Sequence, residues 1–257
     1  MLNTEARAQL QQVLPLEMVA TKSWLEDQGL NLHFIDNAVR SKTLLPLASG
    51  VYVRQDARLS WKSLTASLQR MAVTPIHVGG LTALELDGLS HYLTHATHPT
   101  IHLFSKQSLP RWLYRIDAPA LFAWHGTSRL WPENVMNNEM YIRANTWQAQ
   151  QPPLHYSCPE KAILEVLSDV PNAISFEHAD QLMQGLHNLS PRKLDVLLKT
   201  CRSIKVKRLF LWLAERNQHT WFKHLTPELY KLGTGKRLIA TGGRLEPTWQ
   251  ITVPKEM

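Results

Sequence analysis

One segment near the N-terminus combines the side-chain types that contact DNA bases. On a 3.6-residue period, one side of residues 31–42 carries a polar stripe, which consists of His33, Asn37, Arg40 and Ser41. The opposite side carries Ile35 and Val39, which can pack on neighbouring helices. Asn can pair with adenine, and Arg with guanine, through two hydrogen bonds each. We therefore predict that Asn37 and Arg40 contact base edges in a major groove.

Side chains suited to phosphate contacts flank this stripe, and they are Thr21, Lys22, Lys42 and Arg54. The turn that follows the stripe has an uncharged tip, Ala48-Ser49-Gly50. A contact between this turn and the DNA backbone would therefore depend on Arg54 or on backbone amides. The alternative interpretation of the stripe is a polar, solvent-facing helix in a domain that binds another protein.

The first 55 residues contain the elements that would position these side chains. Apolar spacing and turn residues predict helices over residues 4–14, from 20 or 21 to 29, and 32–44, with Asn31 as the cap of the third. Two short β segments, 45–47 and 51–53, lie on either side of a Ser49-Gly50 turn and predict a hairpin. Three helices followed by a hairpin is the order of a winged helix-turn-helix.

The remainder of the chain mixes helices and strands. Helices are predicted at 59–71, 81–86, 159–167, 176–186, 191–201 and 205–215, with a short one near Trp221. Ser157 and Glu160 have the order of a capping box for the helix over 159–167. Strands are predicted at 101–104, 121–124, 140–142, 237–240 and 249–253. We predict an α+β protein with a winged-helix DNA-binding domain over residues 1–55 and a mixed α+β domain over residues 56–257.

The net charge of +7 is unevenly distributed along the chain. Residues 1–70 carry eight Lys or Arg against six Asp or Glu, residues 71–191 carry six against ten, and residues 192–257 carry fourteen against five. A basic patch is predicted within the last part, at Lys199, Arg202, Lys205, Lys207 and Arg208. Either these cations face outward and bind a polyanion or an acidic partner, or they only solubilise helices whose other faces are buried.

Four histidines, His91, His95, His98 and His102, lie within twelve residues and raise the question of a metal site. The first two have the i, i+4 spacing that can bind zinc from one helix. An HExxH glutamate is missing and Pro99 interrupts the region, so we predict that no metal is bound. Residues 233–236 lack the spacing of a phosphate loop, and no motif marks a nucleophile. We therefore expect no cofactor and no catalytic residue.

Composition excludes several protein classes. The longest apolar run is the six residues 209–214, whereas a transmembrane helix needs about 18 or more. The N-terminus is polar where a secretory signal would be apolar, so we predict a cytoplasmic protein. Cys158 and Cys201 lie far apart, which favours neither a disulfide framework nor a Cys-rich zinc site.

Several short motifs follow the winged-helix segment 21–53 in a characteristic order. They are Gly80-Leu81-Thr82-Ala83-Leu84-Glu85-Leu86-Asp87-Gly88, Cys158-Pro159-Glu160-Lys161-Ala162-Ile163-Leu164, Val206-Lys207-Arg208-Leu209, Gly235-Lys236-Arg237-Leu238, Gly242-Gly243-Arg244-Leu245 and Gln250-Ile251-Thr252-Val253-Pro254. In this order the sequence resembles the AbiEi-type transcriptional regulators, the antitoxins of type IV toxin–antitoxin systems, over nearly its whole length.

The resemblance implies an N-terminal winged helix that binds inverted repeats in double-stranded DNA at the protein's own promoter. It also implies a C-terminal domain that neutralises a nucleotidyltransferase-type toxin without forming a stable complex with it. An antitoxin of this kind is a repressor and not an enzyme.

Two other functions stay open on the residues alone. One is a nucleic-acid-processing enzyme with a histidine or carboxylate site around residues 91–102, and the other is a winged-helix adaptor that binds only protein. Bound metal in the purified protein would favour the enzyme, whereas a neighbouring nucleotidyltransferase gene would favour the antitoxin.

Overall fold

The structure is a computed structural model that describes residues 4–90 and 98–257. The chain divides into two compact units. Among the described residues, the first unit comprises residues 4–77, 98–125 and 144–155, and the second comprises residues 78–90, 126–143 and 156–257. Each unit therefore contains segments that lie far apart in the sequence.

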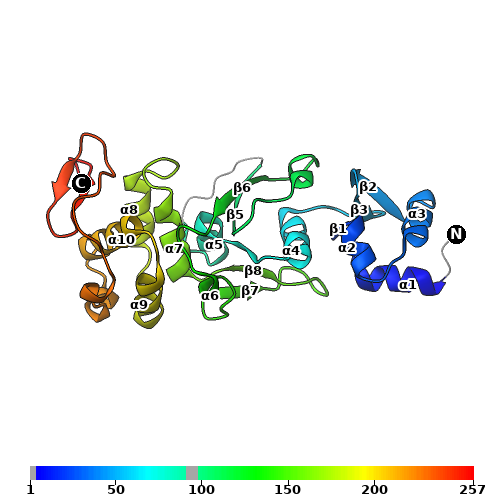
Figure 1. The fold of residues 1–257 in the computed structure, drawn as a ribbon, viewed down its shortest axis with the longest axis horizontal. Helices are drawn as coiled ribbons and strands as arrows, with labels where there is room; N and C mark the ends of the chain where they lie inside the picture. Colours follow the sequence, from blue (N-terminus) through cyan, green and yellow to red (C-terminus); the bar gives the residue numbers. More distant parts are fainter. Residues whose placement is uncertain (1–3, 91–97) are drawn as a thin grey trace. The chain divides into compact units, whose positions relative to one another are not determined.

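Three helices and a small sheet open the first unit (Figure 1), as a winged helix-turn-helix requires. The helices are α1 (Thr4–Val13), α2 (Lys22–Asp27) and α3 (Leu32–Arg40), and the strands are β1 (Val19–Thr21), β2 (Leu44–Ala48) and β3 (Val51–Arg54). The sheet is antiparallel, with the order β1-β3-β2. Thr21 caps α2 by accepting a hydrogen bond from the Trp24 amide, and Asn31 caps α3 in the same way through the Phe34 amide.

The third helix is shorter than the sequence predicts. It ends at Arg40, because Lys42 adopts a left-handed backbone conformation with φ of 58°. Leu44, the predicted last residue, instead begins β2, where it is fully buried and pairs with Arg54. The side chain of Leu44 is thus buried by the sheet and not by an extension of the helix, although its spacing in the sequence fits a helix.

The core of the first unit extends beyond residue 55. The helix α4 (Trp61–Met71) starts with a capping box formed by Ser60 and Ser63. Its Leu64 shares a hydrophobic cluster with Val19 and Val51 of the small sheet. The Val19 amide also donates a 2.9 Å hydrogen bond to the buried hydroxyl of Ser67. Whether residues 1–55 fold as a domain by themselves stays a prediction.

A five-stranded sheet has the strand order β6-β5-β4-β8-β7. Its strands are β4 (Ile76–Val78), β5 (Thr100–Ser105), β6 (Leu121–Gly126), β7 (Ile142–Asn145) and β8 (Leu154–Ser157). The predictions over 101–104 and 121–124 are confirmed, whereas the strand predicted at 140–142 begins only at Ile142. Neither β4 nor β8 was predicted, and they pair in parallel through Val78 and Tyr156.

Helices dominate the second unit, and α7 (Pro159–Ser168) lies at their centre. It packs on α5 (Gly80–Leu86), α8 (Phe176–Gln184), α9 (Pro191–Thr200) and α10 (Ile204–Arg216). Shorter helical segments are α6 (Glu133–Met136), η2 (Thr220–His224) and η3 (Pro227–Leu229), and η1 (Arg111–Tyr114) belongs to the first unit. The predicted capping box of α7 is wrong. Cys158 is the N-cap, because Ser157 ends β8 and its hydroxyl donates to the Glu165 carboxylate.

The second unit ends in two antiparallel strands, β9 (Arg244–Glu246) and β10 (Ile251–Val253). The predicted strand over 249–253 is therefore confirmed in its second half, but its ladder partner is not the segment 237–240. That segment is joined to it by an isolated parallel bridge between Arg237 and Ile251 and by backbone hydrogen bonds, including one from the Ala240 amide to the Thr252 carbonyl. Gly243 allows the chain to pass close to β10, since a Cβ at this position would lie 2.1 Å from the Val253 carbonyl oxygen.

The predicted fold class is confirmed: the protein is α+β, and its N-terminal part carries helices with a small sheet. Among the residues that the structure describes, no helix is both long and apolar enough to cross a membrane.

Candidate nucleic-acid interface

The geometry of α3 separates an apolar side from a polar side. Ile35 and Ala38 are fully buried, and Val39 is half-buried. On the polar stripe, His33, Arg40 and Ser41 are exposed and Asn37 is half-buried. The helix is held at its start by the Asn31 cap, so the stripe is presented from a rigid element.

Hydrogen bonds within the stripe distinguish its members. The Asn37 amide nitrogen lies 3.2 Å from Nδ1 of His33. The Ser41 hydroxyl donates to the Ala38 carbonyl at 3.2 Å and lies 3.0 Å from Oγ1 of Thr43. Arg40 forms no hydrogen bond or ion pair with any residue that the structure describes. Arg40 is thus the stripe residue whose donors are all available to a ligand.

The flanking residues lie on the same part of the first unit. Lys22 forms an exposed 3.5 Å ion pair with Asp36 of α3, and such a pair contributes little to stability. The Thr21 hydroxyl accepts the capping bond of α2 and lies 3.3 Å from the Ser23 hydroxyl, so it can donate outward when Ser23 is the donor of that pair. Lys42 is exposed immediately after α3.

The hairpin gives little support to a wing that contacts DNA. Its turn is tied to the start of α2, because the Gly50 carbonyl accepts a 2.8 Å hydrogen bond from the Lys22 amide. Arg54 pairs with Leu44 at the base of the hairpin, away from the turn at residues 49–50. Burial lowers the pKa of the half-buried Arg54 guanidinium. A contact from Arg54 would therefore be made at the base of the hairpin.

Both interpretations of the basic patch place its five cations in contact with solvent, and this is wrong for two of them. Lys207 and Arg208 are each only 3% exposed. Nζ of Lys207 donates to the carbonyls of Tyr230 and Lys231. The Arg208 guanidinium donates to four carbonyls, those of Leu232, Gly233, Gly235 and Gln250. The physical reason is that the irregular segment 230–235 leaves carbonyls that need donors.

The other three cations of the basic patch are accessible to different degrees. Lys199 is exposed and pairs with Asp195 one helical turn away, at 2.7 Å. Arg202 is exposed and donates to the Ser128 carbonyl. Lys205 is half-buried and donates to the carbonyls of Ser168 and Val170. The cluster is therefore not one continuous charged surface.

A buried polar centre, not anticipated from the sequence, links the motif at residues 80–88 to the motif at residues 158–164 in the second unit. Nζ of Lys161 lies 2.5 Å from Oε1 of Glu165 and 3.0 Å from the Ser157 hydroxyl, and both charged side chains are fully buried. The Gly80 amide donates to the same carboxylate at 3.1 Å. Burial lowers the pKa of Lys161, and Glu165 opposes this change. Because these groups are closed to solvent, we assign them a structural role. The Glu165 carboxylate of α7 accepts from the Gly80 amide and so holds α5 against α7.

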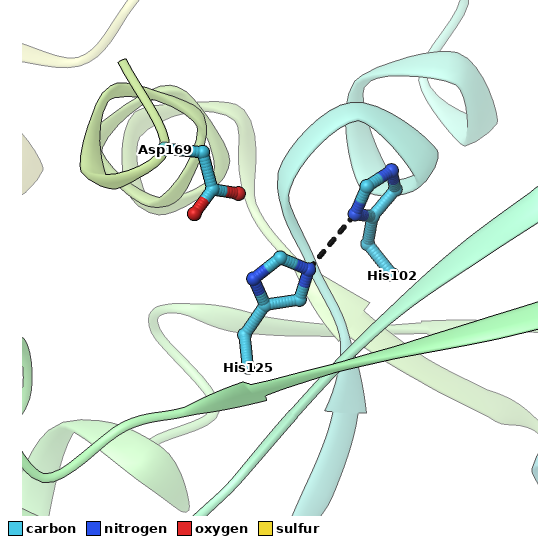
Figure 2. Close-up of side chains that lie close together, drawn as sticks. All are labelled: His102, His125 and Asp169. Atoms are coloured by element: carbon cyan, nitrogen blue, oxygen red, sulfur yellow. Dashed lines mark hydrogen bonds between the residues drawn. The ribbon is translucent and has the colours of Figure 1, made fainter. Parts of the chain in front are cut away.

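Only part of the histidine cluster can be placed. His91 and His95 lie outside the described residues, and His98 is exposed. Nδ1 of His102 on β5 lies 2.9 Å from Nε2 of His125 on β6, as Figure 2 shows. The His125 ring stacks on Phe104 with a centroid distance of 4.5 Å. The absence of a bound metal at these histidines stays a prediction.

Two family models of transcriptional regulators match the sequence. Residues 3–95 match the family model described as "Transcriptional regulator, AbiEi antitoxin N-terminal domain". Residues 98–254 match the model described as "Transcriptional regulator, AbiEi antitoxin, Type IV TA system".

Other comparisons bear on the fold alone. No curated protein matches the sequence. Among solved structures, the chain is similar to the RV2827C protein from Mycobacterium tuberculosis, with 16% identity and a TM-score of 0.50, over 98% of this chain and 92% of that one. Since the two family models together span almost all of its residues, the chain belongs to the AbiEi antitoxin family, the transcriptional regulators of type IV toxin–antitoxin systems.

Proposed function

We propose that the protein binds an inverted repeat in double-stranded DNA through α3 and represses its own promoter. The observation that carries this proposal is the exposed polar side of α3, opposite the buried Ile35 and Ala38. Arg40 would pair with a guanine, because its donors are unoccupied by described residues. Asn37 would pair with an adenine once its amide is released from His33.

Phosphate contacts would orient α3 in the groove. Lys22 and Lys42 supply positive charge on either side of the helix, and the Thr21 hydroxyl can donate from the cap of α2. His33 and Ser41 complete the polar stripe, with Ser41 at its C-terminal end. Such contacts bind all sequences alike, so they supply affinity and leave the choice of sequence to Asn37 and Arg40.

We also propose that the toxin which this antitoxin neutralises is a nucleotidyltransferase and that the two proteins form no stable complex. Membership of the antitoxin family supports a toxin as functional partner. Where a nucleotidyltransferase gene neighbours this one, expression of that enzyme alone should arrest growth, and co-expression with this protein should restore it. Size-exclusion chromatography of the mixed proteins should then show two separate peaks, and co-elution would contradict the second half of this proposal.

The experiment that tests DNA binding compares two variants on the promoter and on an unrelated duplex. Arg40→Ala should weaken promoter binding by about 1 to 3 kcal/mol and relax the preference at one base pair. Lys22→Ala should weaken binding to both duplexes equally. It should also reduce the slope of log affinity against log salt concentration by about one released ion. Fluorescence anisotropy over a salt series measures both effects.

A matched control is Arg192→Ala, which removes an exposed arginine from α9 of the second unit. It should leave promoter affinity unchanged. If Arg40→Ala is folded by circular dichroism and binds the promoter as the Arg192 variant does, α3 is not the element that contacts the bases.

A further inference from the structure

A polar pocket of about 320 Å³ lies within the first unit, beside the C-terminal end of α3. Its lining includes Arg7 from α1, Ser41 and Thr43 from the segment after α3, and Arg54, Gln55 and Asp56 from the end of the hairpin. Ligand pockets begin at about 300 Å³, so the size suits a small group and not a large cofactor.

Two arginines give this pocket its charge. Arg7 is exposed and Arg54 is half-buried, and neither forms a hydrogen bond or ion pair with any residue in the described part of the chain. Arg54 is partly removed from water, as the lowering of its pKa by burial also indicates. A guanidinium group that has lost water without gaining a partner is stabilised by any anion that takes the place of that water.

Gln11 and Gln55 of the lining can donate from neutral amides, so the arginines are the only cationic donors among the described lining residues. The Ser41 hydroxyl donates to the Ala38 carbonyl, and its oxygen lies 3.0 Å from Oγ1 of Thr43. If Thr43 donates to Ser41, both hydroxyl protons are occupied within the protein. The planar fork of an arginine matches two oxygens of a phosphate, so a tetrahedral anion fits this donor set better than a metal or an apolar molecule does.

We propose that this pocket binds a phosphate group between the guanidinium groups of Arg7 and Arg54. Ser41 belongs both to the pocket and to the polar stripe of α3, so the position favours a backbone phosphate of DNA as the source. For that source the inference rests on the proposed function. Inorganic phosphate or a nucleotide would present the same group without any duplex.

Asp56 allows a test in which phosphate binding should become tighter and not weaker. It is the one carboxylate among the described lining residues, and it is exposed. A carboxylate near a bound phosphate repels it, so Asp56→Asn should tighten phosphate binding while Arg7→Gln and Arg54→Gln weaken it. Partial unfolding cannot produce changes in opposite directions.

The experiment uses the full-length protein, the Arg7→Gln/Arg54→Gln double variant, Asp56→Asn and the control Arg111→Gln. Arg111 is an exposed arginine of the first unit outside the pocket. One probe is promoter DNA over a salt series, and the other is inorganic phosphate against chloride at equal ionic strength, followed by thermal unfolding.

If the group is a DNA phosphate, the double variant binds promoter and unrelated duplex about tenfold or more weakly, and the salt dependence is flatter by about two ions. If it is a free phosphate, inorganic phosphate raises the unfolding temperature of the wild type but not of the double variant, and DNA affinity is unchanged. The proposal is overturned if the double variant equals Arg111→Gln with both probes.

This outcome is separable from failure of the proposed function. A wild-type protein that binds no promoter DNA contradicts the function of α3, and the phosphate probe still tests the pocket. Conversely, if Arg40→Ala loses promoter binding while the double variant equals Arg111→Gln with both probes, the function of α3 stands and only the proposed phosphate site is contradicted.

Discussion

Individual residues of one charge type serve two different purposes in the second unit. Arg208 and Lys207 are buried and donate to backbone carbonyls of the segment 230–235, whereas Lys199 is exposed and, among the described residues, pairs with Asp195 alone. The positive charge of the C-terminal part of the sequence therefore overstates the charge that a partner could meet.

This difference predicts unequal effects on stability. Arg208→Met should lower the free energy of unfolding by about 2 to 4 kcal/mol, because four carbonyls lose a charged donor. Lys199→Met should change it by about 0.5 kcal/mol or less, since the pair it breaks is exposed. Urea unfolding followed by circular dichroism measures both, and equal effects would contradict the structural role of Arg208.

His219 predicts a dependence of stability on pH. Its ring is buried, with Nε2 2.7 Å from the Met183 carbonyl oxygen and the ring stacked on Trp221. Burial lowers the pKa of His219 and the neighbouring His187 lowers it further, while the bond to Met183 raises it. The unfolded chain, with a histidine pKa of about 6.5, thus binds a proton that the folded protein resists.

The sign follows from this comparison. Above about pH 7 both states are neutral at this ring and the contribution is constant, whereas below about pH 6.5 the unfolded state is favoured. The thermal midpoint should fall between pH 7 and pH 5.5, and it should fall less in His219→Gln, which keeps a donor for Met183. His98→Gln, at an exposed position, is the control and should follow the wild type.

At the scale of elements, local signals in the sequence were sufficient to locate the longer helices, although not the short segments α6, η1 and η3. The Asn31 cap, the Pro159 start of α7 and the Gly50 turn all act within a few residues, and the structure has each of them. The polar and apolar sides of α3 were likewise visible, because a helical period relates residues three and four apart.

Elements that depend on distant partners were not predictable in this way. The strands β1, β4 and β8 have three or four residues each and acquire their pattern only from neighbours in the sheet. Lys207 and Arg208 looked like surface charges because their carbonyl partners follow more than twenty residues later. The pocket of Arg7 and Arg54 joins residues almost fifty positions apart, so no spacing marks it.

The terminal strand pair gives a prediction at this scale. The backbone of Gly243 lies so close to Val253 that an added Cβ would be 2.1 Å from its carbonyl oxygen and 2.9 Å from the Ala240 side chain. Gly243→Ala should therefore separate β9 from β10 and lower the thermal midpoint by several degrees. Thr241→Ala, at an exposed neighbouring position, should have little effect. A Gly243 variant as stable as the Thr241 variant would show that the strands can shift at no cost.

At the scale of the whole molecule, the boundary of the proposed DNA-binding part can be tested with fragments. A fragment ending at residue 75 keeps Leu64 and Ser67 of α4, which contact the small sheet through Val19 and Val51, whereas a fragment ending at residue 55 loses them. Burial of one leucine is worth about 1.5 to 3 kcal/mol. The longer fragment should melt at a clearly higher temperature. Equal melting temperatures would support an independent domain over residues 1–55.

The parallel pairing of Val78 with Tyr156 also affects the order in which the chain can fold during synthesis. The two residues are 78 positions apart, so at a synthesis rate of about 5 to 20 residues per second the ribosome makes Tyr156 about 4 to 16 s after Val78. During this interval β4 has no β8 to pair with, although the winged-helix residues have already been made. The residues of α1 to α4 are therefore all present on the nascent chain well before β4 can pair with β8.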